Sequence, residues 1–222
     1  MPVLLFDIDG TLYDGHGIGR TAVEATLAAR AGRPVDSSAV PFSGRTDPQI
    51  FRALLAEMDL DEEHLAGVLD AYRDDMVARL PGARATAIPG AAEAVWRLAA
   101  AGLPVGLLTG NLEPVAYLKV EAVGLDRALF PFGAYGSDRE DRNALPLVAA
   151  ERAAAHLGRP VSHRELVVVG DTPLDVACAR AVGAAAVAVT TGRFNADDLA
   201  DADLVLHSLD GLTADAVARL VG

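Results

Sequence analysis

The 222-residue sequence contains a single cysteine, Cys178, and a single lysine, Lys119, and it has no long hydrophobic run. One cysteine excludes an internal disulfide and is typical of a protein in a reducing compartment. Because Cys178 lies in the helical pattern "DVACARAVG", we interpret it as a small buried helix residue rather than a reactive thiol. No apolar stretch approaches the roughly 18 residues that a membrane-spanning helix needs.

Basic residues are also scarce, with 19 Lys and Arg against 31 Asp and Glu and a formal net charge of −12. This excess of negative charge disfavours nonspecific binding to nucleic acid or to anionic membranes. The N-terminus lacks the basic start and the small-residue cleavage site of a signal peptide. We therefore expect a soluble, cytoplasmic protein with no nucleic-acid or membrane partner, in which an anionic substrate is attracted locally, for example by a metal ion.

Apolar runs alternate with helical patterns along most of the chain. Buried strands are expected at residues 2–9, 103–110, 165–171, 184–190 and 202–206. The helical patterns between them end at Gly102, Gly124 and Gly183, where a left-handed cap is typical. This alternation predicts an α/β fold with a doubly wound parallel sheet.

Residues 15–87 break this alternation. They contain amphipathic stretches such as "PQIFRALLAEM" but no strand-like run. The pattern predicts an α-helical cap domain at 15–87, inserted between the first and second core strands of a catalytic core formed by 1–14 and 88–222.

Polar residues gather where the predicted strands end. They are Asp7 and Asp9 after the first strand, Thr109, Gly110 and Asn111 after the second, and Asp171, Thr172 and Asp175 after the third. Ligands of open parallel sheets bind at the carboxyl ends of the strands, so these groups are expected to converge. Carboxylates brought together repel one another unless a cation lies between them, and a hard divalent ion with oxygen ligands, most simply Mg²⁺, fits that need.

Several of these residues also have a purely structural interpretation. Asp175 can close a capping box with Thr172, Asn111 can cap a helix at 112–123, and Thr109 is an ordinary β-branched strand residue. For Asp7 and Asp9 the structural alternative is weak, because two acids at the end of a buried strand are costly unless function requires them.

The motifs "DIDGT" (7–11), "LLTGN" (107–111) and "GDTPLD" (170–175) occur in the order typical of the haloacid dehalogenase superfamily. The chain resembles the helical-cap phosphatase and phosphomutase branch of that family over nearly its whole length. The resemblance implies that Asp7 is the nucleophile and that Asp9 is the general acid and base. It further implies that Asp7, the backbone carbonyl of Asp9 and Asp171 hold Mg²⁺, with Asp175 as a further ligand or a support for the others.

The same resemblance implies how phosphate and substrate are bound. Thr109 and the Gly110 N–H would contact the phosphoryl oxygens together with Asn111, Gly10 and Thr11, the two last of which form the turn after the strand. Arg45, in "FSGRTD" (42–47), would contact a second group of the substrate from the cap. The structural alternative for that loop is that Thr46 or Asp47 caps a helix starting near Pro48.

The family also has a basic residue, usually lysine, ahead of the last acidic motif, and here the sequence departs from the family. Arg142 is the closest positional match. Lys119 is the alternative, but it lies about two turns into the helix after Thr109, so we expect it to point away from the strand ends.

The resulting expectation is a Mg²⁺-dependent phosphatase that acts on a small phosphorylated metabolite through an aspartyl phosphate, with phosphoglycolate or a sugar phosphate as substrate. Two alternatives remain: a β-phosphoglucomutase-like phosphomutase and a noncatalytic phosphate-binding protein. The resemblance argues against phosphonate cleavage, which needs a cap lysine, and against dehalogenation, whose enzymes lack the acid at the position of Asp9. Either a monomer or a homodimer is compatible with the sequence.

Overall fold

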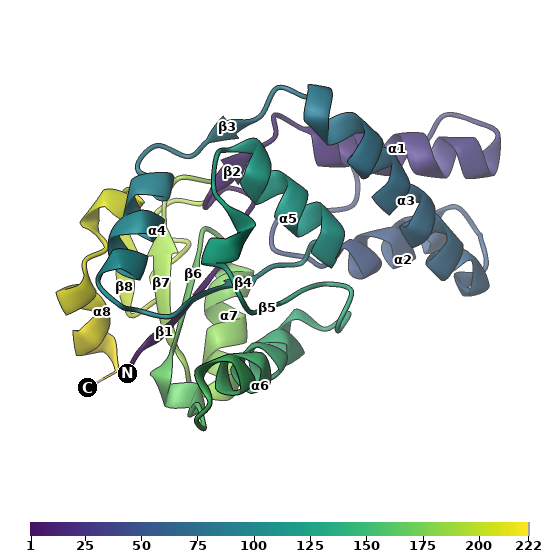
Figure 1. Cartoon of the computed structure of the whole chain (residues 1–222). Coiled ribbons are helices and arrows are strands. Elements are labelled where there is room, and N and C mark those ends of the chain that lie inside the picture. Colours follow the sequence, from purple (N-terminus) through teal and green to yellow (C-terminus); the bar gives the residue numbers. More distant parts are fainter. Residues whose placement is uncertain (222) are drawn as a thin grey trace.

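A six-stranded parallel sheet forms the centre of the protein in the computed structural model, which describes residues 1–221 (Figure 1). The strand order is β5-β4-β1-β6-β7-β8. The strands are β1 (Val3–Phe6), β4 (Val105–Leu108), β5 (Gly133–Ala134), β6 (Leu166–Gly170), β7 (Ala185–Val189) and β8 (Leu204–Leu206). The predicted doubly wound α/β architecture is confirmed. The sequence did not predict β5, because two small residues carry no recognisable strand pattern.

Helices cover both faces of the sheet. In β1, Leu4 and Phe6 face one hydrophobic cluster and Val3 and Leu5 face another, as the two-residue period of a strand requires. The first face is covered by α4 (Ala91–Ala100), α5 (Glu113–Ala122) and α8 (Ala214–Leu220), and the second by α6 (Leu145–Leu157) and α7 (Pro173–Val182). Because both faces are buried, the strands have the continuous apolar sequences of a parallel sheet.

The helix ends follow the glycine signals of the sequence. Gly102, Gly124 and Gly183, which follow α4, α5 and α7, all have positive φ angles between 72° and 81°. A left-handed residue at this position satisfies the last carbonyl groups of a helix and turns the chain. The three predicted helix ends are therefore confirmed.

Three helices lie between β1 and α4 in the chain: α1 (Ile18–Ala31), α2 (Asp47–Glu57) and α3 (Leu65–Arg79). They pack on one another, with the rings of Phe51 and Tyr72 in an edge-to-face contact at 5.1 Å. The segment is entered and left through the short antiparallel strands β2 (Tyr13–Asp14) and β3 (Thr86–Ala87). The expectation of no strand in 15–87 was wrong for β3, which is too short to show a periodic pattern.

The strand order reverses beside β1, which pairs with β4 on one side and β6 on the other. The chain leaves β1 toward β4 and leaves β6 toward β7. A crevice therefore opens at the carboxyl ends of β1 and β6, where doubly wound folds bind ligands. Within residues 1–221, no helix has both the length and the hydropathy needed to cross a membrane.

Candidate active site

A cavity of about 580 Å³ opens at the carboxyl ends of the central strands. Most of the predicted site residues line it: Asp7, Asp9, Gly10, Arg45, Thr109, Gly110, Asn111, Arg142 and Asp171. Thr11 and Asp175 are not part of its wall; they lie behind Asp171 and Arg142 and hydrogen-bond to them. The sheet edge thus brings together residues that are more than 160 positions apart in the sequence.

Three buried carboxylates form an acidic cluster, two of them in the cavity wall and Asp175 behind it. Asp7, Asp171 and Asp175 each offer an oxygen within 4.8 Å of the others, and their exposed fractions are only 4%, 4% and 2%. Burial, together with the charge of Asp175, raises the pKa of Asp171 to about 8. Burial also raises the pKa of Asp7 to about 7, against the opposing effect of Arg142. Buried oxygen ligands with this excess of negative charge fit a hard divalent cation.

Arg142 lies between two of these carboxylates. It belongs to the 3₁₀ turn η4 (Arg142–Ala144) that precedes α6, and its Nη2 is 3.1 Å from Oδ1 of Asp7 and 2.5 Å from Oδ1 of Asp175. The guanidinium is 5% exposed, so these ion pairs are shielded from water. Its Nε has no hydrogen-bond partner among the described residues, which leaves one buried donor of Arg142 free beside the cavity.

Asp175 also closes the capping box that the sequence predicted. Thr172 is the N-cap of α7, and its hydroxyl accepts from the Asp175 N–H while its own N–H donates to Oδ2 of Asp175 at 3.0 Å. With Oδ1 paired to Arg142, both carboxylate oxygens of Asp175 are engaged. Asp175 is therefore placed to support the site from behind.

Close packing around Asp171 leaves no room for a side chain at Gly10 or Gly192. A Cβ at Gly10, where φ is 80°, would lie 2.4 Å from Oδ2 of Asp171, and a Cβ at Gly192 would lie only 1.7 Å from the same atom. The Thr11 hydroxyl donates to Oδ1 of Asp171 at 3.3 Å, and Thr191 donates to the Gly10 carbonyl at 2.7 Å. Thr191 and Gly192 were not predicted as site residues, although they directly follow the strand predicted at 184–190 and so share its edge of the sheet.

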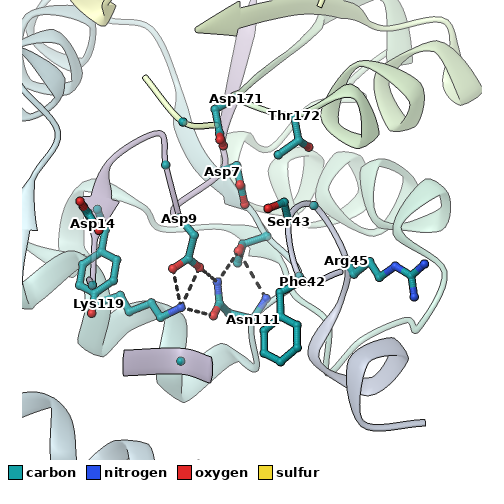
Figure 2. Close-up of a pocket in the computed structure, with 18 of the residues that line it drawn as sticks. Asp7, Asp9, Asp14, Phe42, Ser43, Arg45, Asn111, Lys119, Asp171 and Thr172 are labelled. Atoms are coloured by element: carbon teal, nitrogen blue, oxygen red, sulfur yellow. Dashed lines mark hydrogen bonds and ion pairs between the residues drawn. The ribbon is translucent and has the colours of Figure 1, made fainter. Parts of the chain in front are cut away.

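A second network lies on the opposite wall of the cavity (Figure 2). The Asn111 amide donates to Oδ2 of Asp9 at 2.7 Å and to the Thr109 hydroxyl at 2.8 Å. Asn111 does not cap the helix as expected. Helix α5 has Leu112 as its N-cap, because the Asn111 side chain is turned into the cavity. The expected capping role was therefore wrong, while the residue lines the cavity beside Thr109.

Lys119 belongs to this network, and the expectation that it points away from the strand ends was wrong. Its Nζ lies 2.8 and 2.7 Å from the two oxygens of Asp9 and 2.6 Å from Oδ1 of Asn111. Helical side chains lean toward the N-terminus of their helix, and the long lysine side chain covers the distance from the second turn of α5 back to the site. The lysine and Arg142 thus both contact aspartates of the site, but different ones.

The loop before α2 lies against the Thr109–Asn111 turn. Thr46 caps α2 in a capping box with Gln49, which confirms the structural interpretation of that loop. The Asp47 N–H donates to the Gly110 carbonyl at 2.7 Å. The Arg45 side chain lines the cavity but extends away from Asp7 and Asp9 in Figure 2, so the structure does not bring its guanidinium to the carboxylates.

Cys178 is fully buried in α7. Burial raises the pKa of its thiol to about 12, so the thiolate form is suppressed at neutral pH. The interpretation as a buried helix residue is confirmed.

Known proteins resemble the chain in sequence and in fold. A phosphoglycolate phosphatase from Mesorhizobium japonicum is 28% identical over 99% of this chain and 96% of its own length. Hexitol phosphatase A from Escherichia coli is 30% identical over 94% of this chain and 92% of its own length. The crystal structure of CbbY from Rhodobacter sphaeroides in complex with phosphate superimposes with a TM-score of 0.78 at 20% identity, covering 99% of both chains.

The family profile of haloacid dehalogenase-like hydrolases matches residues 1–183. That range contains the motifs at 7–11, 107–111 and 170–175 and every residue of the carboxylate cluster. With this match and the shared fold, the chain belongs to the haloacid dehalogenase-like hydrolases.

Proposed function

We propose that the protein is a Mg²⁺-dependent phosphatase that hydrolyses small phosphomonoesters through an aspartyl phosphate on Asp7. One observation carries the proposal: the Asp7 carboxylate lines the cavity, is paired with the buried Arg142 guanidinium and is clustered with Asp171. The names of the relatives, phosphoglycolate phosphatase and hexitol phosphatase, support the same reaction class.

The proposed reaction has two displacement steps at phosphorus. An Asp7 oxygen attacks the phosphorus, and the bond from phosphorus to the leaving oxygen breaks while protonated Asp9 transfers its proton to that oxygen. Water then attacks the aspartyl phosphate, the phosphorus–oxygen bond to Asp7 breaks, and Asp9 takes up a proton from the water. Phosphate is released and both side chains return to their starting state.

Other groups of the cavity serve binding and orientation. Arg142 holds Asp7, and its buried Nε has no partner among the described residues. The Thr109 hydroxyl accepts from Asn111, so its own proton is available to a phosphoryl oxygen. Asp7, the Asp9 carbonyl and Asp171 would hold Mg²⁺, supported by Asp175, and the bound ion would supply positive charge beside the phosphoryl group.

The substrate is proposed to be phosphoglycolate or a sugar or polyol phosphate. A cavity of about 580 Å³ is in the range of small-metabolite sites, about 300–1,000 Å³. Residues 15–87 are proposed to act as a cap over this cavity, because α1 and the loop before α2 contribute Ile18, Arg20, Phe42 and Arg45 to its wall. Closing a cap over the phosphoryl group excludes bulk water from the reaction.

A phosphate-release assay with purified protein, MgCl₂ and a panel of phosphorylated metabolites tests the function. Wild-type protein is expected to release phosphate, and Asp7→Asn to abolish release while retaining the fold. Asp215→Asn, which changes an exposed aspartate in α8, is the matched control and should behave as wild type. A wild-type protein that binds phosphate but hydrolyses no substrate would support the noncatalytic alternative, and interconversion of sugar phosphate isomers with little free phosphate would support the mutase.

A further inference from the structure

The single lysine of the chain is buried without contact to Asp7, Asp171 or Asp175. Its side chain is 4% exposed, and its three hydrogen bonds go to the two oxygens of Asp9 and to Asn111. An ammonium group has three donors, so within the described residues every donor of Lys119 is engaged. Lys119 therefore has no free donor with which to bind a phosphoryl oxygen.

We propose that Lys119 is a positioning residue that holds the Asp9 carboxylate at the wall of the cavity where the leaving group lies. The proposal rests on the proposed function, in which Asp9 exchanges protons with the leaving oxygen and with water. It gives Lys119 a role distinct from that of Arg142, which binds Asp7 and Asp175.

The contacts around Asp9 show why a positioning group is needed. The Asp9 side chain is 52% exposed and, unlike Asp7, is not part of the buried acidic cluster. An exposed carboxylate at the end of a strand has several accessible rotamers. Two oxygens bound by one buried ammonium, with an Asn111 N–H as a third contact, restrict it to one orientation.

The hydrogen-bond chemistry also fixes the orientation of the Asn111 side-chain amide, which links Lys119 to Thr109. Lysine can only donate, so the Asn111 atom at 2.6 Å from Nζ must be its carbonyl oxygen. The amide nitrogen then faces Asp9 and Thr109 and donates to both. Lys119 thus orders Asp9 directly and the Thr109 hydroxyl through Asn111. The Tyr13 ring, with its centroid 5.5 Å from Nζ, closes the other side of the ammonium.

Leaving-group dependence distinguishes a role through Asp9 from a general structural role. An alkyl phosphate needs protonation of its leaving oxygen, whereas p-nitrophenyl phosphate releases a stable anion without it. General acid–base catalysis contributes about 10²–10⁴-fold, so Lys119→Met should lower kcat on an alkyl phosphate by about 100-fold. The rate of the first turnover of p-nitrophenyl phosphate should fall by less than about tenfold. Release of p-nitrophenol should then show a burst, because hydrolysis of the aspartyl phosphate still needs Asp9.

A double-mutant cycle with Asp9→Asn isolates the coupling. If Lys119 acts through Asp9, adding Lys119→Met to Asp9→Asn should change the alkyl phosphatase rate by less than about threefold, since effects within one unit are not additive. Arg152→Met, which removes an ion-paired arginine of α6 outside the cavity, is the control and should show no leaving-group dependence. Arg142→Ala should slow both substrates alike.

Equal losses on both substrates, or additive losses in the cycle, would overturn the proposal while leaving the phosphatase function intact. Failure of the wild type on every substrate would instead overturn the proposed function. If circular dichroism shows that Lys119→Met does not fold, Lys119→Gln, which keeps a polar group of similar length, is measured in the same assays. A loss that depends on the leaving group and is not additive with Asp9→Asn would support the proposal, and an equal or additive loss would overturn it.

Discussion

The carboxylate of Asp47, at the start of α2, accepts a hydrogen bond from the Leu112 N–H at the start of α5, with 2.9 Å between Oδ2 and N. Asp47 is 7% exposed, and its own N–H donates to the Gly110 carbonyl. This residue of the helical segment therefore satisfies a backbone donor just after the Thr109–Asn111 turn. A carboxylate at a helix N-terminus also interacts favourably with the helix dipole. The proposed cap and the proposed phosphate-binding turn are joined through this contact.

Asp47→Asn is expected to change how stability depends on pH. Burial raises the pKa of Asp47 to about 6, against the lowering effect of Lys119. The folded protein therefore binds more protons than the unfolded chain between about pH 4 and 6, so the stability contribution of Asp47 falls as pH rises through that window. Between about pH 5 and 7.5, the free energy of unfolding of the wild type should fall by about 1 kcal/mol more than that of Asp47→Asn. Urea unfolding of both proteins at the two pH values measures this, and an equal pH dependence would contradict it.

Mg²⁺ is expected to stabilise the protein more strongly at high pH. The pKa values of Asp7 and Asp171 are raised to about 7 and about 8 by burial, so the metal-free protein loses stability as pH rises from about 4 toward 8. Metal binding requires the deprotonated carboxylates and relieves their repulsion. The increase in Tm with saturating MgCl₂ should therefore be larger near pH 8.5 than near pH 6 by thermal unfolding.

Asp171→Asn provides the control for the metal prediction. It removes a charge from the cluster, so the metal-free variant should unfold at a higher temperature than wild type near pH 8. Its Tm should no longer respond to Mg²⁺. A response equal to that of wild type would show that the ion binds elsewhere.

Gly110→Ala is expected to separate the helical segment from the Thr109–Asn111 turn. A Cβ at Gly110 would lie 2.1 Å from the backbone oxygen of Arg45, and no flexible side chain can yield there. We expect a loss of about 1–3 kcal/mol of stability together with a raised KM. Thermal unfolding and phosphatase kinetics measure the two effects.

Gly67→Ala is the matched control for that steric clash. Gly67 lies in α3, and a Cβ added there would meet no atom within 4 Å. Alanine is also the better helix former by about 1 kcal/mol. This variant should be as stable as wild type or more stable, with unchanged KM. Destabilisation by both substitutions would contradict the steric explanation.

Much of the site could be predicted from local sequence. Asp7, Asp171 and Thr109 each follow an apolar run. Because parallel strands end at the same edge of a sheet, an apolar run predicts that the polar residue after it lies at that edge. The same reasoning extends to Thr191 after β7, which escaped prediction because its surroundings carry no acidic motif. The glycine helix ends were equally predictable, since their signal lies within a few residues.

The amino-acid sequence by itself determined the long apolar strands, the order of the acidic motifs and the glycine turns, because each depends on neighbouring residues, whereas the two-residue strands β3 and β5 carry no such local signal. Only the tertiary structure decided that Lys119 reaches Asp9 and that Asp47 bonds to Leu112. Those contacts depend on the rotation of α5 about its axis and on the docking of α2 against the core. No local pattern encodes either, because both are set by the packing of many side chains at once.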